Sequence, residues 1–258
     1  MSAALGWLGG EVLGVLRAVG VLSLVLARTV LGLGRMSWRE LWRGLVQFGW
    51  GSLPLVLVTG ALTGATVVVQ TGLYVQRFNA RAVLGWAAGY AVLWEFGPLL
   101  LGLMMAARLG ARNAAELATM QVGGQLEGLR GIGLDPFAVL VAPRVVAMGV
   151  SVTSLAPLTF LVAVLFEAMA AYMTLELPLR VFFDNFGNLL SSADLLGGVL
   201  KTSAFGVAIA VVSTGVGLRA RGGARAVGQA AAGAVVWSCA TIFLLDFLLT
   251  AAMTRWLG

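Results

Sequence analysis

The sequence contains no histidine, one cysteine and one lysine, and each shortage removes a class of chemistry. Without an imidazole, the chain cannot use histidine as a base or as a metal ligand. Cys239 on its own forms neither an internal disulfide nor a cysteine zinc cluster. The only lysine, Lys201, follows a leucine, whereas a phosphate-binding G-x-x-x-x-G-K-[ST] loop needs glycine there. We therefore expect no metal, no cofactor and no catalytic site in this chain.

Charge is scarce as well. Only 11% of the residues are charged and 60% are hydrophobic, whereas a soluble domain has about 25% charged residues and about 45–50% apolar ones. An ordinary soluble globular protein is therefore excluded. The formal net charge of +6 is better explained by membrane orientation and anionic headgroups than by a nucleic-acid partner, which we do not expect.

Several charge-free runs are long enough to cross a membrane, which takes roughly 20 mostly apolar residues. They lie between Arg43 and Arg77, Arg144 and Glu167, Lys201 and Arg219, and Arg225 and Asp246, and the run over 82–107 is interrupted only by Glu95. The sequence predicts an all-α integral membrane protein. Its five transmembrane helices would cover 48–76, 82–107, 144–173, 196–218 and 229–255, within one domain over 48–258.

The distribution of basic residues predicts the orientation, because arginine and lysine are retained preferentially on the cytoplasmic side. With the N-terminus inside, the cytoplasmic segments hold Arg17, Arg28, Arg35, Arg39, Arg43, Arg108, Arg112, Arg130, Arg144, Arg219, Arg221 and Arg225. Only Arg77, Arg81, Arg180, Lys201 and Arg255 fall outside or at outer helix ends. We expect a multi-pass protein with a cytoplasmic N-terminus and an outer C-terminus, and no signal peptide.

Residues 1–47 are expected to form interfacial, amphipathic helices. The stretch 12–27 is apolar apart from Arg17, which predicts a helix lying in the membrane interface, and a sixth span over 6–34 is the alternative. Ser37 and Glu40 have the S-x-x-E spacing of a capping box. After them, Trp38, Leu41, Trp42 and Leu45 repeat at helical spacing, with Arg39 and Arg43 opposite, which predicts an elbow helix that enters the first span.

The inner connection over 108–143 is moderately polar and predicts one short helix followed by a break. Gly131 and Gly133 supply turns, Asp135 suits an N-cap, and Pro136 suits the first position of a new helix. A short cytoplasmic helix held between two spans is a suitable docking surface for another protein. A plain re-entry loop is the alternative.

The outer connection over 174–195 predicts a second interfacial helix. Phe182, Phe183, Phe186, Leu189 and Leu190 have helical spacing, and Asp184, Asn185 and Asn188 lie on the other side. The pattern leaves open whether this helix rests on lipid or on a partner. Glycine pairs four residues apart, such as Gly60 with Gly64, are about as frequent as chance allows and predict no particular packing.

Three acids lie within the predicted spans, where a charge costs at least about 2.5–3.5 kcal/mol. Glu95 precedes Gly97 and Pro98, and the proline bends the helix beside the acid. We expect Glu95 to be a polar point in a substrate path, although an acid satisfied by a neighbouring helix fits too. Glu167 and Asp246 are closer to the outer ends, where they can snorkel, and we expect each to be satisfied by a neighbouring helix or protonated rather than to line a substrate path.

Taken in order, several motifs resemble the MlaE (YrbE) family of ABC-transporter permeases. They are Glu95-Phe96-Gly97-Pro98, Ala107-Arg108-Leu109-Gly110, Ala115-Glu116-Leu117-Ala118-Thr119-Met120, Gln125-Leu126-Glu127-Gly128-Leu129, Gly133-Leu134-Asp135-Pro136, Pro143-Arg144, Arg221-Gly222-Gly223-Ala224, Val227-Gly228 and Leu245-Asp246-Phe247-Leu248-Leu249-Thr250. The resemblance covers residues 45 to 255. The chain departs from the family pattern at Gln121, Gly123, Gly124 and Arg225, on the surface expected to dock a partner.

The resemblance implies a homodimeric permease in the bacterial inner membrane, with an interfacial elbow helix, five spans per subunit and a periplasmic C-terminus. It implies that a separate cytoplasmic ABC ATPase binds ATP and Mg, that a periplasmic MCE-domain protein associates outside, and that phospholipid moves between the inner membrane and the outer envelope. By the same resemblance, Glu95 and Phe78, with Tyr74 as a neighbour, would line the lipid pathway. The ATPase-coupling residues would be Arg108, Glu116, Met120, Gln125, Glu127, Asp135 and Pro136.

A second class of function uses the same acids differently. Glu95, Glu167 and Asp246 could serve as proton or ion sites of a secondary transporter or channel. Such a protein would work without a nucleotide or a partner subunit.

Overall fold

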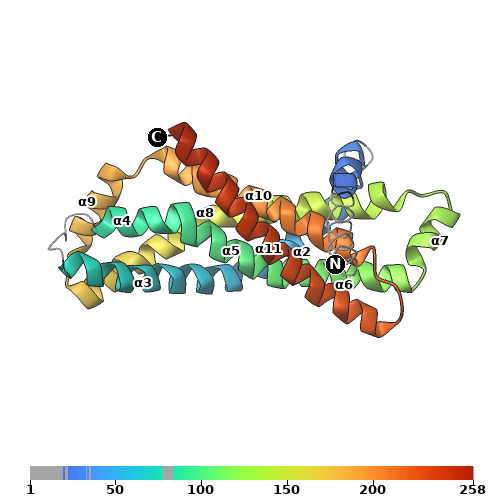
Figure 1. The fold of residues 1–258 in the computed structure, drawn as a ribbon, viewed down its shortest axis with the longest axis horizontal. Helices are drawn as coiled ribbons and strands as arrows, with labels where there is room; N and C mark the ends of the chain where they lie inside the picture. The colour runs from blue at the N-terminus through green and yellow to red at the C-terminus, as the bar shows by residue number, and fades with distance from the viewer. Residues whose placement is uncertain (1–19, 21–22, 33, 35, 78–83, 258) are drawn as a thin grey trace, which may run out of the picture.

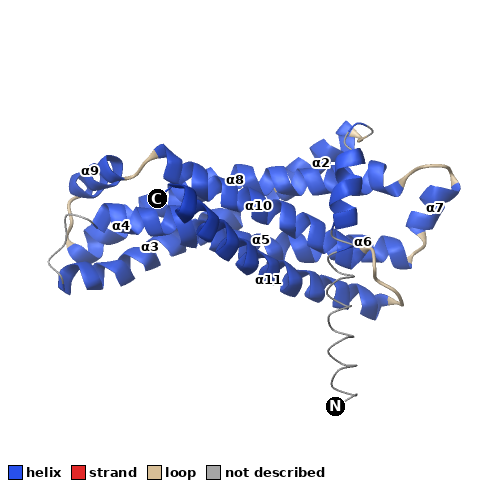
Figure 2. Cartoon of the chain, turned by 45° about the horizontal axis from the view of Figure 1, so that its top comes forward, coloured by secondary structure: helices blue, strands red, loops and turns tan. Residues whose placement is uncertain are grey.

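A computed structural model describes residues 20, 23–32, 34, 36–77 and 84–257. Every regular element in these segments is helical (Figure 2). After a helix over 23–32 they are α2 (Trp38–Phe48), η2 (Trp50–Ser52), α3 (Leu53–Arg77), α4 (Leu84–Ala91), η4 (Val92–Phe96), α5 (Gly97–Met105), η5 (Ala106–Gly110), α6 (Ala111–Val122), α7 (Gln125–Gly131), η6 (Phe137–Val141), α8 (Ala142–Leu175), α9 (Leu179–Leu189), α10 (Ser192–Gly217) and α11 (Ala224–Leu257). Of the short elements, η2 is a 3-10 turn, whereas η4, η5 and η6 are π-helical turns.

Five helical stretches are long and apolar enough to cross a membrane, as predicted. They are Trp38–Val75, Leu84–Val122, Phe137–Leu175, Ser192–Gly217 and Ala224–Arg255. All five are longer than the predicted spans, the first three most clearly, because helical backbone continues through the expected boundaries. The predicted end at residue 107, for example, is bridged by η5, so that α6 prolongs the second span.

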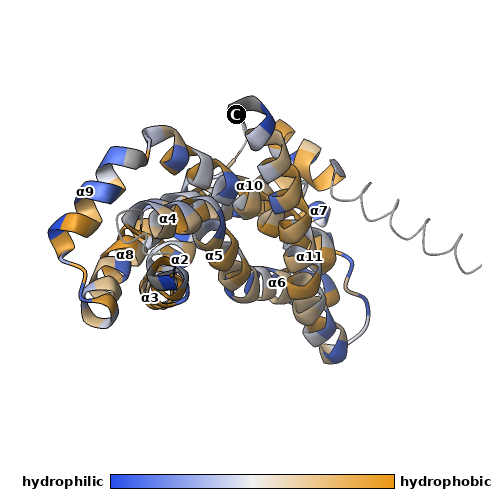
Figure 3. Ribbon diagram, turned by 60° about the vertical axis from the view of Figure 1, so that its left-hand side comes forward, coloured by the Kyte–Doolittle hydropathy of each residue, from blue (hydrophilic) through white to orange (hydrophobic). Residues whose placement is uncertain are grey.

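The long helices run roughly along one axis, and the connecting helices lie at opposite ends (Figure 1). The α7 end carries α6, α7 and the connection between α10 and α11, whereas the α9 end carries α9 and the C-terminus. The long helices are coloured mainly as hydrophobic, and hydrophilic residues gather on α9 and at the ends (Figure 3). This distribution is the one expected for a bundle whose middle lies in lipid.

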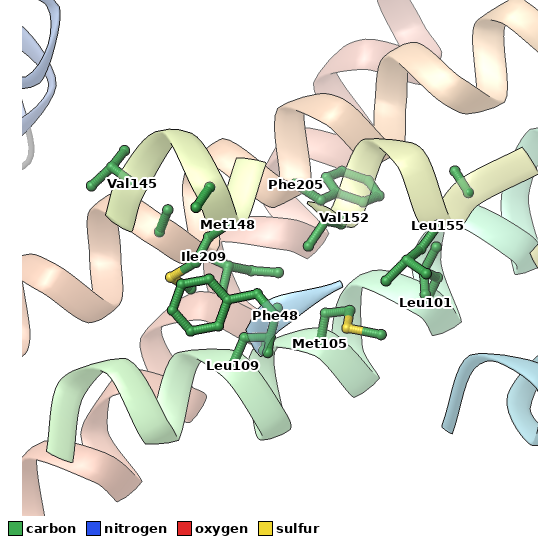
Figure 4. Close-up of a cluster of buried hydrophobic side chains, with 14 of the residues drawn as sticks. Phe48, Leu101, Met105, Leu109, Val145, Met148, Val152, Leu155, Phe205 and Ile209 are labelled. Atoms are coloured by element: carbon green, nitrogen blue, oxygen red, sulfur yellow. The ribbon is translucent and has the colours of Figure 1, made fainter. Parts of the chain in front are cut away.

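Helix α8 occupies the centre of the bundle and packs against α2, α3, α5 and α10. Around it, side chains of α2, α5, α8 and α10 interdigitate in the largest apolar cluster, where Phe48, Met105, Met148, Phe205 and Ile209 are almost fully buried (Figure 4). These phenylalanine, methionine and isoleucine side chains fill the space between the helices, so the middle of the bundle is tightly packed.

The elbow helix α2 begins at Trp38, as predicted, with Ser37 as its N-cap. The predicted capping box is wrong: Ser37 makes no side-chain cap bond, and Glu40 pairs with Arg43 at 2.9 Å instead. The predicted apolar face is divided as well. Leu41 packs inward with Phe48, whereas the exposed fractions of Trp38 and Trp42 are 78% and 69%. The two indoles therefore face away from the bundle, where membrane-interface residues would lie.

The predicted interfacial helix over 12–27 and the alternative span over 6–34 fall mostly outside the described residues. Within the described part, the helix over 23–32 buries Val25 and Thr29 against the bundle. The guanidinium of Arg28 lies 4.9 Å from the ring centroid of Phe137, a cation–π distance that ties this helix to the start of η6.

The inner connection contains the predicted turns and one more helix than expected. Gly124 and Gly133 have φ angles of 69° and 80°, the left-handed region that glycine adopts without strain, and they bracket α7. Asp135 accepts a hydrogen bond from the amide of Phe137 at 3.0 Å, which confirms it as the cap of the helix that Pro136 begins.

Helix α9 is the predicted outer amphipathic helix, and it rests on this chain. Phe182 is fully buried against α4 and α8, and its carbonyl lies over Gly85 of α4. Asp184 and Asn188 are exposed as expected, but Asn185 is half-buried. The pattern left open whether α9 rests on lipid or on a partner, and in the structure its buried side packs on α4 and α8 of the same chain.

Helices α3 and α8 make the closest approach in the bundle at a glycine pair that carried no statistical signal. A Cβ atom added to Gly64 would lie 2.0 Å from the carbonyl oxygen of Ala163, and one added to Gly60 would lie 2.8 Å from that of Thr159. No L side chain fits at the first distance unless the helices separate.

We predict that Gly64→Ala lowers the stability of the protein by about 1–3 kcal/mol, the usual cost of overpacking. The apparent melting temperature in mild detergent measures the change. Gly228→Ala is the matched control, because no atom lies within 4 Å of a Cβ at that helical position and alanine is the better helix former. Equal melting temperatures for the two variants would contradict the packing described here.

Candidate functional site

A buried lysine lies at the junction of three helical segments. The side chain of Lys201 on α10 is 0% exposed, and its Nζ atom donates hydrogen bonds to Glu95 Oε2 at 2.8 Å and to Thr250 Oγ1 at 2.7 Å. The same Nζ lies 3.1 Å from Asp246 Oδ1, an ion-pair distance without hydrogen-bond geometry. The charge cluster formed by Lys201, Glu95, Asp246 and Thr250 therefore joins η4, α10 and α11.

The Lys201 ammonium also uses a backbone acceptor made available by a proline. It donates to the carbonyl oxygen of Trp94 at 2.8 Å. In an α-helix that carbonyl would bond the amide four residues later, but Pro98 stands there and has no N–H. Beside Glu95, where a bend was predicted, the helix widens into the π-helical turn η4. The carbonyl of Trp94, which has no amide partner at Pro98, faces the lysine there.

The charge cluster is exposed to the surroundings on one side only. The side-chain exposed fraction is 41% for Glu95, 9% for Asp246 and 0% for Lys201. The Glu95 carboxylate is therefore the group that an external molecule can reach, while Lys201 holds it from behind. Two interpretations of Glu95 follow from the sequence, a polar point on a pathway and an acid paired with a neighbouring helix. The structure is compatible with both, because the carboxylate is exposed and is also paired with Lys201.

The aromatic side chain before Glu95 connects the charge cluster to the start of α10. Trp94 Nε1 donates to Asp194 Oδ1 at 2.7 Å, and Asp194 Oδ2 accepts from the backbone amide of Ser191 at 2.8 Å in a complete capping box. On the preceding turns, Tyr90 stacks on Trp94 with ring centroids 5.7 Å apart. Helix α10 is therefore anchored to the second span at two levels.

One expectation about intramembrane charges was wrong. Lys201 does not lie at an outer helix end, because Glu95 and Asp246 compensate for its charge inside the bundle. Asp246 does not snorkel, but it is paired with Lys201 of the neighbouring helix α10, as expected for an acid without a pathway role. Glu167 is fully buried in α8, and both of its carboxyl oxygens lack a hydrogen-bond partner among the described residues.

Tyr74, another pathway candidate, is not part of the charge cluster. It lies on α3, is exposed and lines a hollow of about 440 Å³ with Gln70, Leu73 and Arg77. Among the described residues no hydrogen bond links Tyr74 to Glu95. Phe78 lies outside the described residues.

The coupling candidates separate into an anchored group and an exposed group. Glu116 pairs with Arg112 and with Arg144, each at 2.9 Å, and Arg108 donates to the carbonyl of Gly51 at the start of the first span. Pro136 is buried, and Met120 is half-buried near the end of α6.

The exposed group lies on and after α7. Gln125, Glu127 and Asp135 are exposed there, and Asp135 uses its carboxylate as the helix cap described above. The exposed candidates therefore lie on and after α7, while the anchored residues hold α6 in place.

Sequence reasoning missed Lys201, Trp94, Thr250 and the buried Asn113. The amide of Asn113 on α6 donates to Ser213 Oγ at 2.9 Å and to Thr214 Oγ1 at 3.1 Å on α10. A lone lysine bordering a long apolar run was the available signal for Lys201. The described residues contain no group of three or more His, Cys, Asp and Glu side chains arranged to hold a metal ion.

We predict that Lys201→Met destabilises the protein by about 3–5 kcal/mol, because it leaves two carboxylates without their buried cation. The fraction of monodisperse protein that survives heating in detergent measures the loss. Adding Asp246→Asn and Glu95→Gln to Lys201→Met removes the unpaired charges and should restore much of the stability. A triple variant no more stable than Lys201→Met would show that the pairing contributes little.

Comparison with known proteins places this geometry in a family. Residues 41–252 match the family described as Permease MlaE. A probable ABC transporter permease protein of Rickettsia felis is 32% identical over 208 residues, covering 81% of this chain and 80% of that protein. A probable ABC transporter permease protein of Synechocystis sp. is 30% identical over 230 residues, covering 87% of this chain and 86% of that protein.

A third relative is longer. The chloroplastic protein TRIGALACTOSYLDIACYLGLYCEROL 1 of Arabidopsis thaliana is 30% identical over 217 residues, which cover 84% of this chain but 62% of that protein. The family match includes all five apolar helices, the charge cluster and the α6–α7 connection. The chain therefore belongs to the MlaE permease family.

Proposed function

We propose that this chain is the membrane-spanning subunit of an ABC transporter that moves phospholipids between a bacterial inner membrane and the outer envelope. Family membership and the names of the Rickettsia and Synechocystis relatives support a transmembrane ABC permease. The name of the Arabidopsis relative contains that of a galactolipid, which supports lipid as the transported class.

The observation that carries this proposal is the half-exposed carboxylate of Glu95, held by a buried cation on an otherwise apolar bundle. Acyl chains need only van der Waals surface, whereas a headgroup needs a few fixed polar contacts. Glu95 can accept hydrogen bonds from an ammonium or hydroxyl of a headgroup. Lys201 behind it offsets part of the negative charge, so an anionic phosphate is repelled less than it would be by a lone carboxylate.

The first and last spans supply the apolar surface. Helix α3 exposes Leu62 and Leu73, and α11 exposes Phe243, Leu244 and Phe247, which are more than half exposed. Large contiguous apolar faces on membrane helices require lipid or protein against them. In a homodimer these faces would enclose a lipid cavity, and we assign them that role.

The energy would come from a cytoplasmic ATPase docked at the α7 end, with an MCE-domain protein beyond the opposite end. ATP and Mg would bind to the ATPase, while this chain does no catalysis. Our assignment requires the α7 end, with Gln125 and Glu127, to face the cytoplasm. The N-terminus would then be cytoplasmic and the C-terminus periplasmic.

The ion-coupled alternative draws on the unpartnered carboxyl of Glu167. A proton path would need a chain of polar groups joining Glu167 to the charge cluster. Glu167 is instead flanked on α8 by Ala163, Val164 and Ala168 of an apolar cluster, and neither of its carboxyl oxygens has a hydrogen-bond partner among the described residues. Lipid transport driven by a partner subunit therefore has the better support.

We expect an ABC ATPase and phospholipid to co-purify with this chain from its native membrane in mild detergent. Glu127→Arg should reduce ATPase recovery by about tenfold, since like charges or clashes across a contact cost more than about 1.4 kcal/mol. Asp184→Arg makes the same charge reversal on α9 and should leave recovery unchanged. A lone chain that transports ions without nucleotide would instead establish the alternative.

We expect Glu95→Gln to lower ATP-dependent transfer of a fluorescent phospholipid between proteoliposomes by about tenfold or more. A hydrogen bond to a charged group is worth about 1.5–3 kcal/mol, and the amide removes the charge while keeping an acceptor for Lys201. Asp184→Asn makes the same chemical change on exposed α9 and serves as the control. Undiminished transfer by Glu95→Gln would remove Glu95 from the pathway.

A further inference from the structure

An apolar cavity lies on the side of the bundle formed by α8 and α9, and Leu93 of η4 also lines it. It has a volume of about 480 Å³, and we call it the α8–α9 groove. Phe160 forms part of its wall from α8 and Phe183 and Phe186 line it from α9, while Leu190 and Leu195 line it where α9 turns into α10. Neither Glu95, Lys201 nor Asp246 lines this groove.

The lining chemistry excludes ordered water as the main occupant. A buried water needs two to four polar partners. The polar side chains in the lining are those of Ser191 and Ser192, and the hydroxyl of Ser191 already accepts a hydrogen bond from the amide of Ala193 at 2.9 Å. The groove is therefore suited to an apolar molecule, which would recover the contacts that the empty walls forgo.

The size of the groove distinguishes a flexible chain from a helix. A partner's transmembrane helix about 10 Å wide would fill about 480 Å³ with roughly one turn, whereas a single acyl chain is much narrower. On the α8 side the lining includes Leu161 and Leu165, which are 58% and 50% exposed on a spanning helix. The groove is thus continuous with the surface that faces the hydrocarbon of the bilayer.

We propose that the α8–α9 groove binds one acyl chain of a phospholipid from the surrounding bilayer, at the α9 end of the bundle. The chain enters between α8 and α9 and lies against Phe160, while its headgroup remains beside the polar face of α9. The site requires only that the chain spans a membrane. It does not depend on transport, on the ATPase or on Glu95.

The test places the purified full-length chain, without nucleotide or partners, in phosphatidylcholine nanodiscs. A trace of phosphatidylcholine with a diazirine at the end of one acyl chain is photoactivated, and labelled residues are mapped by mass spectrometry. Phe160 is 2% exposed, so labelling there requires a chain inside the groove. We also expect Leu161 to be labelled more strongly than Met173 of α8, which is 72% exposed and does not line the groove.

A matched pair of variants tests the same site. Gly187 lines the groove and has no atom within 4 Å of an added Cβ, so Gly187→Leu should fill the space. We expect labelling of Phe160 to fall by about tenfold, which corresponds to about 1.4 kcal/mol of binding. Gly128→Leu makes the same substitution on exposed α7 at the opposite end of the bundle, where an added Cβ also meets no atom within 4 Å, and should leave labelling unchanged.

Two results would overturn the proposal. One is an unlabelled Phe160 in the wild type, together with labelling of Leu161 that is no stronger than that of Met173. This result would mean contact with bulk lipid only. The other is equal labelling of Phe160 in folded Gly187→Leu and in the wild type. The wild-type measurement decides by itself if Gly187→Leu fails to fold, and either result leaves the outcome of the lipid-transfer assay unaffected.

Discussion

A single ammonium group inside an apolar bundle constrains the arrangement of this protein more than any other group. A lysine at the centre of a membrane helix is tolerated only where other groups compensate for its charge. Lys201 receives that compensation from two different helical segments, since Glu95 belongs to the second span and Asp246 to the last. The Trp94 carbonyl, which Pro98 leaves without its helical amide, completes the set of acceptors. Three of the five spans must therefore meet at one depth, each with a fixed rotation about its own helix axis.

The last span shows why that rotation matters. Helix α11 packs mainly on α10 and α6, and much of its surface is exposed. Apolar contacts alone specify the rotation of such a helix weakly, because lipid is as apolar as a leucine side chain. Asp246 and Thr250 are one turn apart and both reach Lys201, so they direct one face of α11 inward. Phe243, Leu244 and Phe247 are then left on the outside, where a second copy or lipid can contact them.

The sequence was informative wherever one residue or one local run determines the structure. Charge-free runs located all five spans, Gly133 adopts the left-handed turn that the absence of a side chain allows, and Asp135 caps the helix that follows. It was uninformative where the structure depends on contacts between residues of different helices. No local pattern shows that Lys201, Glu95 and Asp246 meet, and assigning each charge separately placed Lys201 and Asp246 at helix ends. The close packing at Gly60 and Gly64 could not be predicted for the same reason, because it depends on the carbonyls of α8 that lie opposite.

The continuity of the second span links the two halves of the candidate site. One helical rod over Leu84–Val122 carries both Glu95 and Glu116, which lie roughly 30 Å apart at a rise of about 1.5 Å per residue. The rod contains two π-helical turns, and turns of this kind occur frequently at functional sites. At the α7 end, Arg144 and Ser213 fix the rod to α8 and α10, and further along Lys201 fixes it to α10 and α11. Displacing α6 would therefore strain the polar contacts that position the Glu95 carboxylate, which gives a docked subunit a physical route to that group.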